Sequence, residues 1–298
     1  MNNTLILSSF ISGYFRNAHK YISEIYKTNY PTKIEKHLRK ISIKLNIFPK
    51  YFLNSWFEKL DQYSTIILFD NGHSENLIKI IKKKNPNIRI IFWYWNPVYL
   101  SVPVSKITKE CEIWSYREAD CRKYGLRQNT QFFIEQEFKD QSSEIIQDVY
   151  FLGCDKNRSN ILYNLSKELQ KHNISYKFVL TKFKNSKESY IKYSNKISYE
   201  ENIKNIFESK VVVDIVDENQ KTGVSLRPFE SAICHRKLIS NDSYLKNLKF
   251  YSPNNIFILG VDEEDKLRDF INTPYDTSID NKLDYYEIKE WINRFFKV

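Results

Sequence analysis

The segment 221–242, KTGVSLRPFESAICHRKLISND, contains several charged and hydroxyl residues. It comes shortly after the apolar stretch at 211–216. Ser225 is a typical N-cap residue, so we expect a helix to begin there. A helix N-terminus presents N–H groups and the positive end of its dipole to an anion, and Lys221 and Arg227 add formal charge. Glu230, one turn into the helix, could accept hydrogen bonds from hydroxyl groups. The pattern predicts a site for a diphosphate that carries a ribose or a sugar, and the alternative is a capped helix with a surface ion pair.

A second group of cations lies in FLGCDKNRSNIL, residues 151–162. An apolar stretch ends at Gly153, and Lys156 and Arg158 occupy the loop before the next predicted helix. Paired cations of this kind stabilise a diphosphate leaving group without a metal ion. The loop is not a P-loop, because the pattern G-x-x-x-x-G-K-(S/T) is absent. A basic helix start that is simply exposed to solvent is the alternative interpretation.

Two further loops carry residues that suit a hydroxyl-bearing partner. Asp70 and His73 lie in FDNGHSEN, directly after an apolar stretch. Either could be the general base that takes a proton from a hydroxyl group, and the alternative is a loop that caps a helix. Tyr94 and Asn96 lie in WYWNPV at the end of another predicted strand, where they suit a pocket for a sugar acceptor. Core aromatic residues followed by a turn are the alternative there.

Short apolar segments alternate with helix-length segments along the chain. The predicted strands are residues 4–9, 64–70, 89–95, 111–116, 148–153, 175–181, 211–216, 237–240 and 256–260. This alternation predicts parallel sheets that are covered by helices on both faces. In such sheets ligands bind beyond the carboxyl ends of the strands, which is where the candidate residues lie.

The alternation starts afresh after a polar, irregular segment at 117–147. We therefore predict an α/β protein with two doubly wound, Rossmann-like domains that face each other across a cleft. Residues 1–145 would bind an acceptor, and residues 146–280 would bind a nucleotide. Residues 281–298 contain apolar residues at helical spacing, which predicts an amphipathic helix that could pack back on the first domain.

Composition narrows the partners and the compartment. The chain has 298 residues and a formal net charge of +10, which favours phosphates, an anionic membrane or nucleic acid as partners. Its four cysteines form no CxxC pair, so we expect free thiols in a reducing cytoplasm. The sequence has no run of about 18 apolar residues, so we expect a cytoplasmic protein without a membrane span. The basic segment 33–44 has Ile34, Leu38 and Ile41 on one helical face, which would suit the anionic inner face of a plasma membrane, with a solvated helix as the alternative.

The first segment also matches a known pattern. Its matching positions are Gln220, Gly223, Ser225, Arg227 and Glu230, followed by KLISN at 237–241. This arrangement resembles the donor-binding motif of GT-B glycosyltransferases. It is most similar to bacterial lipopolysaccharide and capsule enzymes that resemble the spore maturation glycosyltransferase group. The resemblance covers most of the chain, is specific in the C-terminal half and is loose before residue 60.

The resemblance implies a GT-B fold and transfer of a sugar from a nucleotide-sugar donor to a lipopolysaccharide, capsule or other surface-glycan acceptor. It implies a donor site in the C-terminal domain formed by Gly153, Lys156, Arg158, Lys221, Gly223, Ser225, Arg227 and Glu230. Retaining families have an acidic residue eight positions before the helix glutamate, where this chain has Thr222, so retention and inversion both stay open. No D-x-D pair is present, and we expect no metal and no other cofactor at the chemical step.

Three other functions fit parts of the sequence. A sugar-nucleotide epimerase or hydrolase would use the same donor site without an acceptor. A non-catalytic partner subunit of a polysaccharide assembly complex would need no base. A basic nucleic-acid-binding protein would explain the charge, but the sequence has no helix-turn-helix, zinc or single-strand-binding signature, so we expect no nucleic-acid partner.

Overall fold

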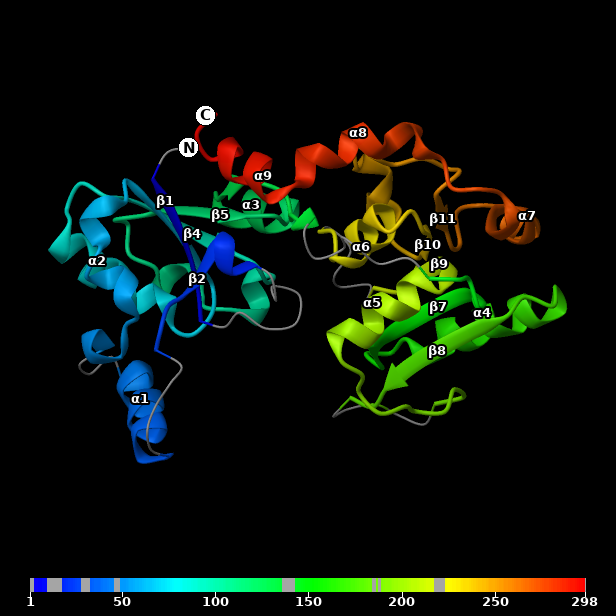
Figure 1. The fold of residues 1–298 in the computed structure, drawn as a ribbon, viewed down its shortest axis with the longest axis horizontal. Coiled ribbons are helices and arrows are strands. Elements are labelled where there is room, and N and C mark those ends of the chain that lie inside the picture. The colour runs from blue at the N-terminus through cyan, green and yellow to red at the C-terminus, as the bar shows by residue number, and fades with distance from the viewer. Residues whose placement is uncertain are drawn as a thin grey trace. The chain divides into compact units, whose positions relative to one another are not determined.

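The chain forms two compact units, Met1–Thr130 (unit 1) and Gln131–Val298 (unit 2), each built around its own sheet (Figure 1). The structure, a computed structural model, describes residues 3–9, 18–27, 33–45, 49–135, 143–183, 186, 189–216 and 223–297. The predicted limits of the domains, at residues 145 and 280, stay a prediction.

Unit 1 contains a six-stranded sheet in the order β2-β1-β3-β4-β5-β6, in which all neighbouring strands are parallel. Its strands are β1 (Thr4–Ser8), β2 (Ile22–Glu24), β3 (Thr65–Phe69), β4 (Arg89–Tyr94), β5 (Glu112–Ser115) and β6 (Arg127–Gln128). Every residue of β3 is buried, as expected for a parallel strand that is covered on both faces.

Helices and short 3-10 turns connect the strands of unit 1. The α-helices are α1 (Lys33–Leu45), α2 (Leu77–Lys84) and α3 (Glu118–Tyr124). The 3-10 turns are η2 (Ala18–Lys20), η3 (Pro49–Phe52), η4 (Ser55–Phe57), η5 (Leu60–Gln62), η6 (Ser74–Asn76), η7 (Val98–Leu100) and η8 (Val104–Lys106). Leu77, Ile78 and Ile81 of α2 pack with strand residues such as Leu68 and Phe92 in the core of this unit.

Unit 2 contains a five-stranded parallel sheet in the order β11-β10-β9-β7-β8. Its strands are β7 (Gln147–Cys154), β8 (Tyr176–Thr181), β9 (Ser209–Asp214), β10 (Lys237–Ser240) and β11 (Ile256–Ile258). Its helices are α4 (Ser159–Lys171), α5 (Tyr199–Phe207), α6 (Arg227–Ile233), α7 (Leu267–Asn272), α8 (Asp280–Leu283) and α9 (Ile288–Arg294). Its 3-10 turns are η11 (Ser243–Asn247), η12 (Glu264–Lys266), η13 (Thr277–Ile279) and η14 (Asp284–Tyr286).

Helices cover both faces of the unit 2 sheet. Since successive strand residues point to opposite faces, neighbouring residues of one strand pack against different helices. Val212 packs on the side of α5 and α6, in one cluster with Phe229. Val213, the next residue of β9, packs on the side of α4 and α7, in a second cluster with Leu165. The two parallel sheets and their flanking helices confirm the predicted doubly wound α/β architecture.

The first part of the C-terminal segment belongs to the core of unit 2, because Leu283 and Tyr286 lie in one cluster with Phe229. Phe133 forms a parallel bridge with Glu287, and the ring of Trp291 in α9 lies 4.3 Å from that of Phe132. Trp291 is fully buried, and the packing of this segment on the first domain stays a prediction. Within the part of the chain that the structure describes, no helix has the length and apolar character needed to cross a bilayer.

Both sheets share one strand order. Numbered from the first strand of each unit, the order begins 2-1-3-4-5, so the chain reverses its direction of winding between β1 and β3 and between β7 and β9. In sheets of this type, ligands bind beyond the carboxyl ends of the two strands at this switch point. The switch point of unit 2 therefore lies beyond Cys154 and Asp214.

Candidate functional site

Arg227, the first residue of α6, lies at the switch point of unit 2. Its Nη2 donates a hydrogen bond to the carbonyl oxygen of Leu152 in β7, at 3.2 Å. Its Nη1 donates to Oδ1 of Asn202 in α5, at 3.2 Å, and lies 3.0 Å from Oε2 of Glu230. The guanidinium is therefore held by groups from β7, α5 and α6 at once, which fixes its position.

Glu230 is nearly buried beside this guanidinium. Its Oε1 accepts a hydrogen bond from the hydroxyl of Tyr199, at 3.2 Å, and 6% of its side chain is exposed. Burial works against the charge of Arg227, but the carboxylates of Glu230 and Asp214 hold the pKa of Arg227 above its usual value. A carboxylate offers about four lone-pair sites, so these two contacts leave Glu230 able to accept hydroxyl groups.

Ser225 joins the end of β9 to the start of α6. Its Oγ donates to Oδ2 of Asp214, at 2.7 Å, and accepts from the backbone N–H of Arg227, at 3.2 Å. Asp214 is the last residue of β9. Ser225 thus ties the entry of the helix to the carboxyl end of the strand.

The first turn of α6 differs from the prediction. The helix begins at Arg227, with Leu226 as its N-cap, rather than directly after Ser225. Pro228 has no N–H, and the N–H groups of Phe229 and Glu230 both donate to the carbonyl of Leu226. The N–H group of Arg227 donates to Oγ of Ser225, so the N–H groups that we expected this helix to offer to an anion already have partners in the same segment. The positive charge of Arg227 is therefore the main attraction for an anion at this point.

The loop between β7 and α4 has its own internal cap. Oδ1 of Asp155 accepts from the N–H groups of Arg158, at 3.1 Å, and of Ser159, at 3.2 Å. Its Oδ2 accepts from the hydroxyl of Tyr193, at 2.6 Å. Nη1 of Arg158 donates to the carbonyl of Cys154, at 3.2 Å. The cation of this loop is therefore positioned at the carboxyl end of β7.

Gly153 makes room for that arrangement. A Cβ atom at this position would lie 2.8 Å from Cζ of Phe151 and 3.1 Å from Nη1 of Arg158. Lys156 places its Nζ 5.5 Å from the centre of the Phe183 ring, in a cation–π contact. The carbonyls that hold Arg158 and Arg227 are two residues apart on β7, roughly 6.6 Å along the strand. The structure thus brings two guanidinium groups to one strand end.

Most of the predicted donor residues converge, and some of their partners were missed. Lys221 lies outside the described residues, and Gly223 is buried in the segment before α6. The residues that orient the predicted ones were not predicted, and they are Asp155, Tyr199, Asn202 and Asp214. The S-x-x-E pattern at Ser198–Glu201 predicts the start of α5, which Ser198 caps. It does not predict which residues the side chains of α5 contact.

In unit 1, Asp70 follows the last residue of β3 and is nearly buried. Its Oδ1 accepts from the N–H of Trp95, at 3.0 Å, and its Oδ2 accepts from the N–H of Asn96, at 3.2 Å. Burial raises its pKa to about 6, against the hydrogen bonds, which lower it. A carboxylate with a pKa near neutrality suits a general base.

His73 lies three residues further and has a different environment. Half of its side chain is exposed, 51%, and its Nδ1 lies 3.4 Å from Oε1 of Glu75. Its backbone is in the left-handed region, with φ of 59°. The two candidate bases therefore differ in their exposure to solvent, because Asp70 is nearly buried and His73 is half exposed.

Tyr94 is a correction. We expected its ring in a sugar pocket, but it is fully buried in the core of unit 1. Its hydroxyl donates to the carbonyl of Val102, at 2.6 Å. A strand in a parallel sheet is covered on both faces, so the alternation of side chains did not bring this ring to the surface. Asn96 is exposed next to Asp70, as a residue at an acceptor site must be.

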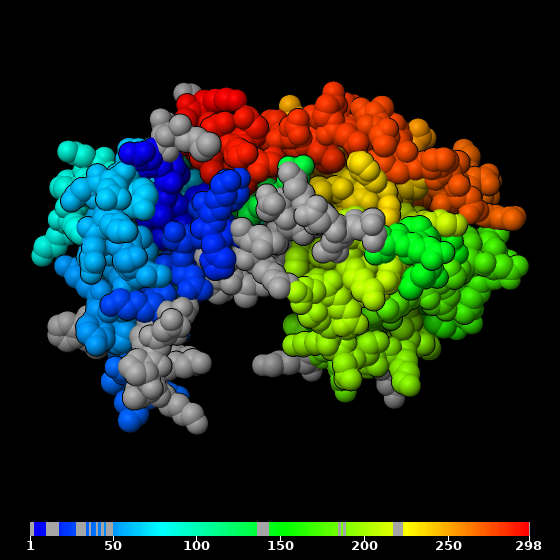
Figure 2. Space-filling model, viewed as in Figure 1, coloured from blue at the N-terminus to red at the C-terminus, as the bar shows by residue number. Residues whose placement is uncertain are grey.

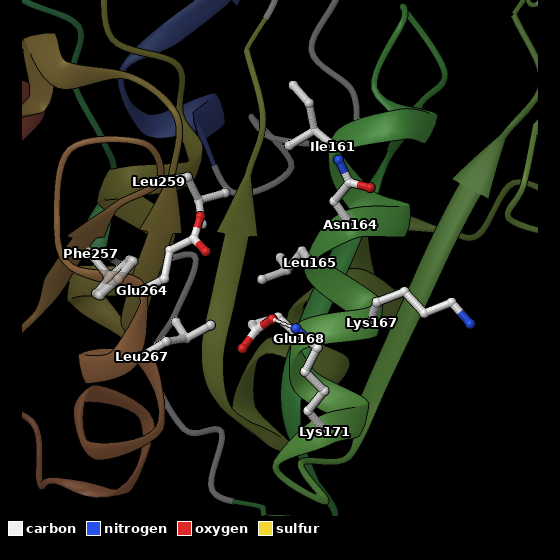
Figure 3. Close-up of a pocket in the computed structure, with 10 residues that line it drawn as sticks. All are labelled: Ile161, Asn164, Leu165, Lys167, Glu168, Lys171, Phe257, Leu259, Glu264 and Leu267. Carbon is white, nitrogen blue, oxygen red and sulfur yellow. Dashed lines mark hydrogen bonds and ion pairs between the residues drawn. The ribbon is translucent and has the colours of Figure 1, made fainter.

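A groove of about 460 Å³ lies elsewhere on unit 2, between α4 and the segment from β11 to α7 (Figure 3). Leu165 and Leu267 form part of its lining, and Glu168 there pairs with Lys171 at 2.6 Å. The groove belongs to the face of the sheet covered by α4 and α7, whereas Arg227 begins α6 on the other face. It is therefore separate from Arg227, although its α4 wall begins just after Arg158.

The structure describes no group of three or more His, Cys, Asp or Glu side chains placed to hold a metal ion, counting only the residues that it places. The expectation that the chemical step needs no metal and no other cofactor stays a prediction.

No protein-family model matches the sequence, and no curated protein is similar to it at the level of sequence. Solved structures match over the whole chain. An alpha-glucosyltransferase in complex with UDP and a 13-mer DNA containing a HMU base has a TM-score of 0.54 and 11% identity, covering 100% of this chain and 99% of its own. The lipopolysaccharide outer core galactosyltransferase WaaB has a TM-score of 0.52 and 11% identity, covering 99% of this chain and 98% of its own. The chain therefore has the GT-B fold.

Proposed function

We propose that the protein is a glycosyltransferase that moves a sugar from a nucleotide-sugar donor to a lipopolysaccharide, capsule or other surface-glycan acceptor. The observation that carries the proposal is the pair of Arg227 with the buried carboxylate of Glu230 at the switch point of unit 2, where Arg158 also binds the last residue of β7. Two cations beside a carboxylate with unused lone pairs suit a ligand that has both a diphosphate and hydroxyl groups. The GT-B fold is consistent with this ligand.

The donor residues would have distinct roles. Arg158 and Arg227 would neutralise the diphosphate, so that it can leave with its negative charge stabilised. Glu230 would accept hydroxyl groups of the ribose or the sugar. Ser225 would hold the entry of α6 in place, and Lys156 would add charge at the edge of the site.

If the reaction inverts the anomeric centre, unit 1 would supply the base. The acceptor hydroxyl would lose its proton as its oxygen forms a bond to the anomeric carbon, and the bond from that carbon to the diphosphate oxygen would break. Asp70 has a pKa of about 6 that suits this proton transfer. His73 has the better access, since its side chain is half exposed. Asn96 beside Asp70 would contact the acceptor.

A sugar-nucleotide epimerase or hydrolase is the second candidate, because it would use the same donor residues without an acceptor. A non-catalytic basic binding protein is the third. Release of free sugar that no acceptor increases would favour the second, and nucleotide binding without any turnover would favour the third. We also propose that the enzyme works in the cytoplasm at the inner face of the plasma membrane, where lipid-linked acceptors are presented.

The first experiment is a thermal-shift screen of the full chain against UDP, GDP, CDP, dTDP and CMP. A ligand at 100 times its Kd adds about 2.7 kcal/mol to the free energy of unfolding. We expect one diphosphate to raise Tm by several degrees, and Glu230→Gln and Arg227→Lys to reduce that shift. The matched control is the exposed Glu118–Arg122 pair, where Glu118→Gln should leave the shift unchanged.

The result that would reject the proposal is the absence of a shift from every nucleotide. A shift that both site variants retain would reject the assignment of the donor site to Arg227 and Glu230. Once a nucleotide is identified, transfer of labelled sugar from the matching donor to an extracted glycan acceptor tests the reaction itself.

A further inference from the structure

The helix α1 carries an apolar stripe that faces solvent. Ile34, Leu38, Ile41 and Leu45 are all exposed, by between 53% and 71%. With 3.6 residues per turn, these four positions fall within an arc of about 60° and run the length of the helix. We call them the α1 stripe. Monomeric proteins rarely leave contiguous apolar surface of this kind without a partner.

The stripe is not what holds α1 to unit 1. Nη1 of Arg39 donates to the carbonyl of Lys27, at 3.3 Å, on a different side of the helix from the stripe. The ribbon shows α1 extending from unit 1, clear of its sheet (Figure 1), and the same end of unit 1 is visible in the space-filling view (Figure 2). The apolar side chains are therefore available to a partner.

Basic residues accompany the stripe. The helix sequence KIEKHLRKISIKL contains five lysine or arginine residues and one acidic residue, Glu35. By helical periodicity, positions 33, 37, 40 and 44 follow one border of the stripe, and three of them are lysine. An exposed apolar stripe bordered by cations is the pattern of helices that lie in the interface of a membrane.

We propose that α1 docks the protein on an anionic lipid bilayer, with the α1 stripe inserted at the boundary between headgroups and acyl chains. The lysine border would then contact anionic headgroups, which attract basic residues close to the surface. Nucleic acid fits less well, because phosphate contacts use the cations and leave the four aliphatic side chains in water. The inference specifies where the membrane contact of the proposed function lies.

The test is co-sedimentation of the full chain with vesicles made of equal parts phosphatidylglycerol and phosphatidylcholine, compared with phosphatidylcholine alone. We expect at least tenfold stronger binding to the anionic vesicles, weakened as salt rises from about 0.1 M to about 1 M. Leu38→Gln/Ile41→Gln keeps the net charge and a good helix former at each position, and we expect it to bind at least tenfold more weakly.

The matched control is Ile146→Gln/Val261→Gln, which removes two exposed aliphatic side chains from unit 2. It should bind vesicles as the unchanged chain does. Equal binding of the α1 stripe variant and the unchanged chain would overturn the proposal, and so would binding to duplex DNA with no binding to anionic vesicles. The readout needs no donor and no acceptor, so a negative result would remove the membrane contact and leave the nucleotide test of the proposed function unaffected.

Discussion

The two sheets have the same strand order, but different side chains lie at their switch points. In unit 1, the side chain of Asn71 connects the ends of β3 and β1. Its Oδ1 accepts from the N–H of Ser9, at 2.7 Å, and its Nδ2 donates to Oγ of Ser8, at 3.1 Å. In unit 2, the corresponding position holds the guanidinium of Arg227 paired with Glu230. One switch point is closed by a neutral amide, and the other presents charge.

This difference shows that the parallel sheet decides where a ligand can bind but not which ligand it is. Both sheets end their strands at a comparable edge, and only the residues placed there differ. The carboxyl edge of unit 1 has a carboxylate, Asp70, with a pKa of about 6, which suits proton transfer. The carboxyl edge of unit 2 has Arg158 and Arg227, which suit a polyanion.

The largest effect should come from Gly72→Ala in unit 1. A Cβ there would overlap the Cβ of Ser9 and lie 2.8 Å from its Oγ, and the backbone has φ of +62°. Backbone strain and overpacking each cost up to about 3 kcal/mol, so we expect the variant to be largely unfolded at 37 °C by circular dichroism. Gly153→Ala is the counterpart in unit 2, where the nearest atom is the edge of the Phe151 ring, which can move. A folded Gly72→Ala protein would contradict the close packing at this switch point.

Arg227→Ala should destabilise the chain by about 3–5 kcal/mol in urea denaturation, because it leaves the buried carboxylate of Glu230 unpaired. It should also abolish the nucleotide-induced thermal shift. The double variant Arg227→Leu/Glu230→Leu should recover part of the stability and none of the binding. Recovery of binding together with stability would mean that the pair has a structural role alone.

Asp70 should make the free energy of unfolding depend on pH. Its pKa is about 6 in the folded chain against 3.8 for an unperturbed group, so between these values the folded state holds a proton that the unfolded state has lost. Stability should therefore fall by about 3 kcal/mol as pH rises from about 3 to about 7 and stay lower above that.

Urea denaturation across this pH range measures the effect. The side chain in Asp70→Asn does not titrate, so this variant should lose the fall of unfolding free energy with pH. The control Asp61→Asn changes an exposed carboxylate and should keep that fall. An unchanged slope in Asp70→Asn would show that burial does not raise the pKa of this carboxyl.

The smallest effects should come from two serines at the switch points, Ser8 at the end of β1 and Ser225 beside the end of β9. Ser225→Ala removes the hydrogen bonds of its Oγ to Asp214 and to the N–H of Arg227, and Ser8→Ala removes the acceptor of Asn71. Each should cost about 1 kcal/mol. Isothermal titration with the nucleotide should show weaker binding for Ser225→Ala only. Equal Kd values for both variants would argue against a role of the β9–α6 connection in binding.

Much of the fold could be predicted because its signals are local. The strand at 237–240 has the predicted bounds, and β9 ends at Asp214 against a predicted end at 216. The start of α6 was predicted too early, because Leu226 is the N-cap and Ser225 instead links Asp214 to the N–H of Arg227 from outside the helix. Tyr94 was misplaced because both faces of its strand are covered, and sequence alone does not show which residue of a buried strand reaches the edge.

The sequence by itself determined the alternation of strands and helices, the cations after two of the strands and the acidic residue in the helix that follows. These features depend on neighbours a few residues apart, so composition and spacing reveal them. Only the tertiary structure decided that Arg227 binds the carbonyl of Leu152, 75 residues away in sequence, and that Asn202 and Tyr199 orient the pair. The order in which parallel strands associate sets these contacts, and that order is a property of the whole sheet rather than of any segment within it.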